Sequence, residues 1–128
     1  MIALECYIEA GIMLTKRKHR RITIAGSATL GFKKRGEIQS IQTLIANISL
    51  RGIGLYSYSS IKAETSVSIS TNFISFDGGL KTDSIEGRVV SNTKISKTHF
   101  LGVQCHEEID AHNQPSLFKH LQNILPAD

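Results

Sequence analysis

Polar and apolar residues alternate with a period of two over much of the chain, as is typical of half-buried β-strands. The clearest stretch is residues 66–73, where Val67, Ile69, Thr71 and Phe73 alternate with polar side chains. A second stretch runs from residue 22 to 32, with Ala28, Leu30 and Phe32 on its apolar side. The same reasoning predicts further strands over residues 37–50, from Ile53 onward, over 85–90, and over 100–105 with Leu101, Val103 and Cys105 facing inward.

Turn-forming residues separate these stretches. They are Lys33-Lys34-Arg35-Gly36, Arg51-Gly52 and Asp77-Gly78-Gly79, and glycine suits such turns because it adopts positive φ without strain. Short strands joined by turns, with no helix between them, predict an all-β fold, an antiparallel barrel or sandwich.

The period changes near the end of the chain. Leu117, Phe118, Leu121, Ile124 and Leu125 recur at helical spacing. Asn113 is expected to cap this helix, Pro115 suits its first turn and Pro126 ends it. We therefore expect one short amphipathic helix after the strands.

Residues 1–15 are treated as an N-terminal extension of undetermined structure. Their apolar positions alternate as in a strand, but Leu4, Ile8 and Ile12 also fit one face of a helix. Translation starting naturally at Met13 is a further hypothesis, and it would place the following basic residues at the N-terminus.

The composition indicates one domain with a modest excess of positive charge. The 128 residues include 15 Lys and Arg against 11 Asp and Glu, a net charge of +4, which attracts anions of any kind. Cys6 and Cys105 form no C-x-x-C motif, so reduced thiols and a cytoplasmic location are expected. Glu5 and Glu9 interrupt the apolar N-terminal segment, which argues against a signal peptide, and no apolar run approaches the ~20 residues of a membrane span.

The motifs of catalysis are missing from the sequence. It contains neither G-x-S-x-G nor the phosphate loop G-x-x-x-x-G-K-[ST]. Cys105 and His106 lie near His99, Glu107, Glu108 and His112, but adjacent residues on a strand point to opposite faces. We therefore expect no enzyme activity, no metal and no cofactor.

The run Lys16-Arg17-Lys18-His19-Arg20-Arg21 holds five of the fifteen cations. Arg17 and Arg21 are four residues apart, about 6 Å along a helical turn or about 13 Å along a strand, so both can reach one ligand. Arginine suits bidentate contact with a phosphate or a guanine edge. A solvated tail is the alternative interpretation.

A second polar cluster follows at Asn47-Ile48-Ser49-Leu50-Arg51-Gly52. Asn47 and Ser49 are two apart and would project from one face of a strand. Gly52 and Gly54 would permit a tight turn and a close approach of a ligand to the backbone. The alternative is an ordinary Asx or Ser turn at the end of a strand.

The pattern R-x-x-x-R (Arg17 to Arg21), a strand, then [D/N]-x-S-x-x-G (Asn47, Ser49, Gly52) resembles that of PilZ domains. These domains are six-stranded antiparallel β-barrels that bind the bacterial second messenger cyclic di-GMP. Gly87-Arg88-Val89-Val90, Phe100-Leu101-Gly102-Val103 and the terminal helix extend the resemblance over residues 16–125.

The resemblance implies roles for individual residues. Arg17 and Arg21 would hold the phosphates and guanine edges from a flexible arm, Asn47 and Ser49 would bond a guanine, and Gly52 would leave space. Arg20 and Arg88 are further candidates, the latter for stacking on a base. Two departures are Ser91, where the family often has tryptophan, and the neutral Asn47 in place of a carboxylate, which together predict moderate affinity.

The function expected from these motifs is that of a bacterial, cytoplasmic cyclic di-GMP receptor without enzyme activity. Binding would change the surface shown to a partner protein in motility, secretion or exopolysaccharide control. One alternative is a PilZ-like interaction scaffold that binds no nucleotide. Another is a small basic barrel that binds single-stranded nucleic acid, for which Tyr56 and Tyr58 offer the only aromatic platforms beside a strand.

Overall fold

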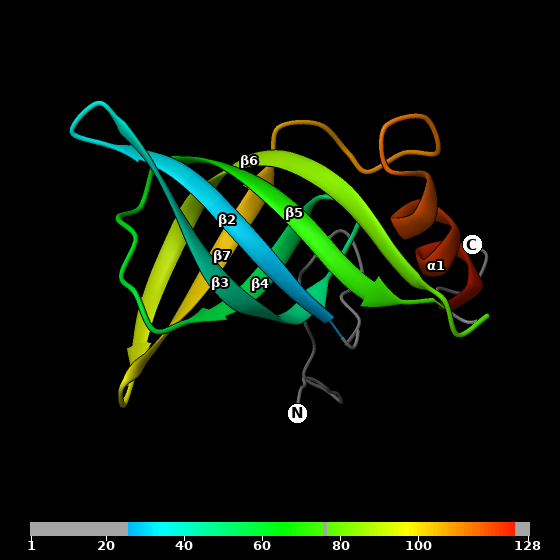
Figure 1. The fold of residues 1–128 in the computed structure, drawn as a ribbon, viewed down its shortest axis with the longest axis horizontal. Helices are drawn as coiled ribbons and strands as arrows, with labels where there is room; N and C mark the ends of the chain where they lie inside the picture. Colours follow the sequence, from blue (N-terminus) through cyan, green and yellow to red (C-terminus); the bar gives the residue numbers. More distant parts are fainter. Residues whose placement is uncertain (1–25, 76, 125–128) are drawn as a thin grey trace, which may run out of the picture.

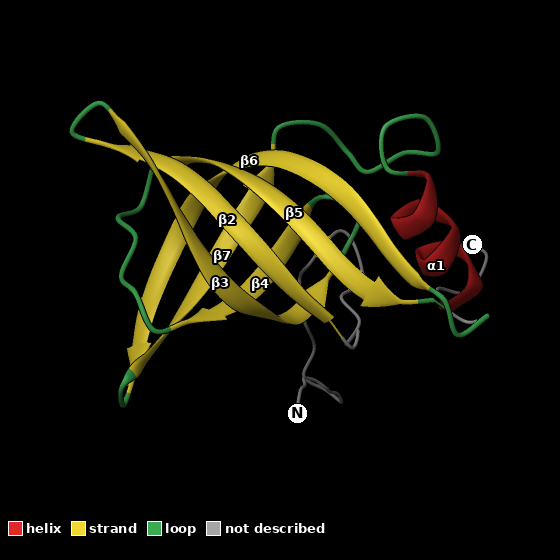
Figure 2. Cartoon of the chain, viewed as in Figure 1, coloured by secondary structure: helices red, strands yellow, loops and turns green. Residues whose placement is uncertain are grey.

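The structure, a computed structural model, describes residues 26–75 and 77–124. These residues form six strands and one helix (Figure 1): β2 (Gly26–Lys34), β3 (Glu37–Ile48), β4 (Gly52–Ser57), β5 (Ser66–Ile74), β6 (Leu80–Ile95), β7 (Thr98–Cys105) and α1 (Pro115–Ile124). All neighbours pair antiparallel in the order β2-β3-β4-β7-β6-β5, and β5 pairs with β2 to close the barrel (Figure 2). The predicted six-stranded antiparallel barrel with a short C-terminal helix is confirmed.

Because every strand runs antiparallel to the next, the connections alternate between the two ends of the barrel. The turn 49–51, the hairpin 75–79 and the segment 106–114 lie at the end that carries α1, which we call the helix end. The turn 35–36, the loop 58–65 and the turn 96–97 lie at the opposite end, which we call the loop end (Figure 1).

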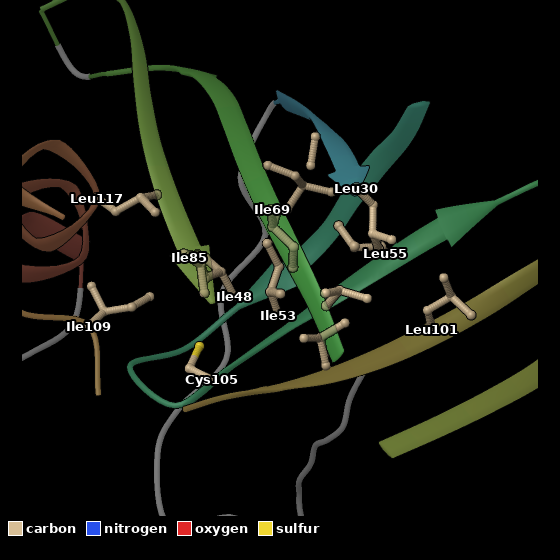
Figure 3. Packing of buried hydrophobic residues seen from close by; sticks show 14 of the residues in the cluster. Leu30, Ile48, Ile53, Leu55, Ile69, Ile85, Leu101, Cys105, Ile109 and Leu117 are labelled. Atoms are coloured by element: carbon tan, nitrogen blue, oxygen red, sulfur yellow. The ribbon is translucent and has the colours of Figure 1, made fainter. Parts of the chain in front are cut away.

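The barrel interior is filled by alternate side chains of all six strands. Ile109 and Leu117 close the core at the helix end (Figure 3). The buried apolar side chains are Ala28, Leu30, Ile45, Ile48, Ile53, Leu55, Ile61, Val67, Ile69, Phe73, Ile85, Val89, Leu101, Val103, Cys105, Ile109, Leu117 and Leu121. The predicted inward faces of β2, β5 and β7 are therefore confirmed.

Several strand boundaries differ from the sequence prediction. β2 continues through Lys34, and only Arg35 (φ 54°) and Gly36 (φ 81°) form the turn. Two central residues with positive φ match the twist of the flanking strands, so the hairpin is tighter than expected. β6 runs from Leu80 to Ile95 rather than over 85–90, and β3 ends at Ile48 rather than at residue 50.

The helix α1 is capped by a residue from the barrel, and the prediction that Asn113 caps it was wrong. Asp83 of β6 is buried, and its Oδ2 accepts a hydrogen bond from Leu117 N at 2.7 Å. The backbone N–H of Asn113 instead donates to Asp110 Oδ1 at 2.7 Å. Gln114 precedes the helix and donates from Nε2 to Ser84 O at 3.0 Å.

Leu117 and Leu121 are buried beneath α1 and Phe118 is partly buried. Leu125 and the side chain of Ile124 lie outside the description. No helix within residues 26–75 and 77–124 has the length and apolarity needed to cross a bilayer.

Replacing Asp83 with Ala is expected to lower the free energy of unfolding by about 1–2 kcal/mol, because a buried helix N–H loses its acceptor. Urea denaturation measures the change. Glu107→Ala removes an exposed carboxylate at the same end of the barrel and should change stability by less than about 0.5 kcal/mol. Equal effects of the two substitutions would show that the Asp83 cap contributes nothing.

His120 of α1 is buried against the barrel. Its ring meets the ring of Phe73 edge-on, with 5.4 Å between the centroids and 72° between the planes. The side chain is 7% exposed, and this burial lowers the pKa of His120 below its ordinary value of 6.5. The folded protein therefore holds a neutral imidazole against Phe73.

Acidification below pH ~6.5 is therefore expected to destabilise the fold, because the unfolded state takes up the His120 proton before the folded state does. The loss grows as pH falls from about 6.5 toward the lowered pKa of the folded state and is absent above pH 7. Urea denaturation at pH 7.5 and 5.5 measures it. His120→Phe should reduce the dependence on pH, whereas His112→Gln, at an exposed histidine, should leave it unchanged. A dependence that survives in His120→Phe would contradict this assignment.

Candidate ligand-binding site

The structure places the described candidate residues on neighbouring elements. Asn47 lies on β3, Ser49 in the following turn, Gly52 at the start of β4 and Arg88 on β6. Arg17, Arg20 and Arg21 lie outside the described residues, so their part of the predicted site stays a prediction.

A β-bulge in β3 turns Asn47 toward the outside of the barrel. Ile45 pairs with Leu55, but the next pair is Asn47 with Gly54, so Ala46 is an extra residue on β3. Ile45 and Ile48 are both buried although they are three residues apart. Without the bulge, Asn47 would share the inward face of Ile45. The prediction that Asn47 and Ile48 face opposite sides is confirmed.

A second bulge lies in β6, at Val90. The register shifts between Val89, which pairs with Val103, and Ser91, which pairs with Gly102. Gly102 also pairs with Gly54 across β4 and β7. Both bulges therefore border one row that crosses four strands on the outer face. We call it the glycine row: Asn47, Gly54, Gly102 and Ser91.

The two glycines let side chains lie directly on the backbone of the barrel. A Cβ added to Gly54 would lie 2.9 Å from Asn47 Oδ1 and 2.8 Å from Phe100 Cζ. A Cβ added to Gly102 would lie 2.5 Å from Ser91 Oγ. No alanine fits either position without moving a neighbour. The glycine row thus holds an amide and a hydroxyl directly over the buried backbone of two glycines, and bulges are often found where a side chain is aimed at a ligand.

An aromatic pair adjoins the glycine row on the side of the loop end. Tyr56 and Phe100 are paired residues on β4 and β7, with ring centroids 5.3 Å apart and a tilt of 56°. Tyr56 is 45% exposed although it is a large aromatic side chain. The pair offers a π-face beside Asn47 on which a planar ring can stack.

Ser49 serves the turn between β3 and β4. Its N–H donates to Gly52 O at 2.8 Å, its hydroxyl donates to the same oxygen at 3.4 Å, and its Oγ accepts from Arg51 N at 3.3 Å. The prediction that Ser49 projects from a strand beside Asn47 was wrong, because β3 ends at Ile48 and the chain reverses through Leu50 and Arg51. Its contacts are those of the Ser turn that the sequence left as the alternative.

The same turn is joined to the segment that leads into α1. Cys105 N donates to Arg51 O at 2.8 Å, and Ile109 N donates to Leu50 O at 2.7 Å. Arg51 Nε also pairs with Glu108 Oε2 at 3.2 Å. A displacement of the turn would therefore act on residues 105–109 directly.

Arg88 lies on the outer face of β6 with its guanidinium already engaged. It forms an ion pair with Glu64, and its Nη2 lies 3.5 Å from Gln104 Oε1. Gln104 pairs with Gly52 on β4, so Arg88 is two strands away from the start of β4. The ion pair uses the edge of the guanidinium, so its faces stay available for stacking on a base.

Sequence reasoning missed the part of the site that strand pairing creates. Gly102 and Phe100 were recognised only as strand residues, and the contact between Arg51 and Glu108 joins residues 57 apart in the chain. That Asn47 pairs with Gly54, and Ser91 with Gly102, can be seen only when the strand register and its bulges are known. Within residues 26–75 and 77–124 no three His, Cys, Asp or Glu side chains gather to hold a metal ion.

Comparison with known proteins agrees with this architecture. The structure of the Bacillus subtilis inhibitor of motility MotI/DgrA is similar, with a TM-score of 0.64, 16% identity, and coverage of 86% of this chain and 52% of that one. The chain thus spans about half of that protein. The PilZ domain with c-di-GMP of YcgR from Escherichia coli has a TM-score of 0.55, 15% identity, and coverage of 86% and 88%.

A search among curated proteins found no sequence match. The family model described as the PilZ domain, however, matches residues 15–125, which include both predicted motifs. With the closed six-stranded barrel and its terminal helix, this match places the chain in the PilZ domain family.

Proposed function

We propose that this protein is a cyclic di-GMP receptor that acts by binding rather than by catalysis. The observation that carries the proposal is the position of Asn47. A bulge turns its amide to the outer face, where it lies over the backbone of Gly54 and beside Tyr56 and Phe100. An amide next to an aromatic face suits a purine, because it combines edge hydrogen bonds with stacking.

The proposed binding mode divides the ligand between two groups of residues. Asn47 bonds a guanine edge on the glycine row, with Gly52 and the Ser49 turn holding the backbone that carries it. Arg17 and Arg21, supplemented by Arg20, supply charge-assisted contacts to phosphate and guanine. Arg88, held by Glu64 through its edge, is a further candidate to stack on a base with its face.

The turn 49–52 supplies a route from the ligand to a partner surface. Its hydrogen bonds to Cys105 and Ile109 and the ion pair between Arg51 and Glu108 connect it to the segment before α1. Binding that shifts this turn changes the surface of residues 105–114 and α1. A downstream protein in motility, secretion or exopolysaccharide control would read that surface, and one similar structure is that of an inhibitor of motility.

Arg17→Ala and Arg21→Ala are each expected to weaken cyclic di-GMP binding about tenfold to more than a hundredfold, the effect of losing one charge-assisted contact of about 1.5–3 kcal/mol. Isothermal titration calorimetry measures the affinity and stoichiometry. Arg35→Ala is the matched control, because it removes an exposed arginine at the loop end and should leave affinity within about twofold.

Unchanged affinity in both variants would remove the R-x-x-x-R motif from the mechanism. The absence of binding heat for the unchanged protein would reject the receptor function and favour an interaction scaffold. A strongly salt-dependent gel shift with single-stranded oligonucleotides, without cyclic di-GMP binding, would favour the nucleic-acid alternative.

Substitutions at Asn47 should move affinity in both directions. Asn47→Asp should tighten binding several-fold, because a carboxylate accepts both guanine N–H donors with charge assistance whereas the amide offers one oxygen. Asn47→Ala should weaken binding about tenfold. Calorimetry of the three proteins gives the order. Equal affinities throughout would show that the ligand does not contact residue 47.

A further inference from the structure

The loop end of the barrel collects most of the exposed positive charge of the described chain. Each of its three connections contributes, and all the side chains concerned are exposed. The cations are Lys33, Lys34 and Arg35 around the first turn, Lys62 in the loop 58–65, and Lys94 and Lys97 around the third turn.

These cations are not neutralised by neighbouring carboxylates. Among residues 26–75 and 77–124, none of the six takes part in an ion pair. The acids at this end are Glu37 and Glu64, and Glu64 is paired with Arg88. The helix end by contrast carries Asp77, Asp83, Glu107, Glu108 and Asp110. Arg51, Lys81 and Lys119 at the helix end offset part of this acidic charge, two of them in ion pairs. Within the described residues the loop end is therefore the more positive of the two ends.

Each connection at the loop end also exposes one large apolar side chain. Ile38 is 78% exposed, Tyr58 83% and Ile95 51%. Strand pairing, a core contact and a hydrogen bond fix the backbone that carries these three side chains. Lys33 and Ile38 are paired residues across the β2–β3 hairpin, Ile61 anchors the loop of Tyr58 in the core, and Thr98 Oγ1 donates to Ile95 O at 2.8 Å.

We propose that the loop end docks this protein on an anionic lipid surface. Lysine and arginine are attracted to acidic headgroups, and aliphatic and tyrosine side chains enter the boundary between headgroups and acyl chains. Three separate connections, each with an apolar side chain beside cations, suit such a surface.

The side chains at the loop end favour lipid over a macromolecular partner. Lysine is depleted in the cores of protein interfaces, yet five of these six cations are lysines. Single-stranded nucleic acid would need aromatic platforms on which successive bases stack, whereas of these three exposed side chains only Tyr58 is aromatic and Ile38 and Ile95 are aliphatic. Docking through the loop end leaves α1 and the segment 106–114 directed away from the membrane, accessible to a partner.

Co-sedimentation with phospholipid vesicles tests the proposal, using phosphatidylcholine alone and with about 30% phosphatidylglycerol. The unchanged protein should bind only the anionic vesicles, and less as salt is added. Lys94→Glu with Lys97→Glu should lower the partition coefficient at least about tenfold. Ile38→Ser with Ile95→Ser should lower it about fivefold or more without altering charge.

The matched control is Lys81→Glu with Lys119→Glu, which makes the same change in net charge at the helix end. It should leave binding within about twofold, because β6 alone spans 16 residues, roughly 50 Å, far beyond the screening length of about 10 Å at 0.1 M salt. Residues 16–21 are common to all variants. Equal losses of vesicle binding in the two charge-reversed proteins would overturn the proposal. Failure of the unchanged protein to bind anionic vesicles would do the same. So would a result in which the loop-end substitutions weaken binding to oligonucleotides but not to vesicles.

Discussion

Closure of the barrel by the pairing of β2 with β5 is the constraint on which the remaining structure depends. It leaves no free strand edge among the described strands, so interactions must use the outer face or the two ends. It also sends alternate connections to opposite ends. The Ser49 turn thereby lies beside the segment that leads into α1, and the lysine-rich connections gather at the far end.

Two departures from regular pairing give the outer face its chemistry. The bulges at Ala46 and Val90 both border the row Asn47, Gly54, Gly102 and Ser91. A polar side chain at each end of the row lies over a glycine where no Cβ would fit. Asn47 and Ser91 can lie so close to the backbone because both glycines are present, and a ligand reaching the same backbone would have to displace these side chains.

Much of the fold could be predicted from the sequence because period-two patterns and turn residues act locally, as between Val67 and Phe73. The cap of α1 could not, because Asp83 reaches Leu117 across 34 residues. Likewise Asn47 and Ser49 look equivalent in the motif, but the strand ends between them. The bulges leave no local signal: the period of three from Ile45 to Ile48 becomes interpretable only when the partners Leu55 and Ile53 are known.

The most direct test of the central claim is a titration with cyclic di-GMP followed by ¹H–¹⁵N NMR of the backbone amides. If the ligand binds on the glycine row, saturable shift changes should concentrate at residues 47–54, 91 and 100–102, extending to 105–109 through the Ser49 turn. Amides of the loop end, such as Gly36 and Lys97, should not move. Spectra that stay unchanged at saturating ligand, or changes confined to the loop end, would contradict the account.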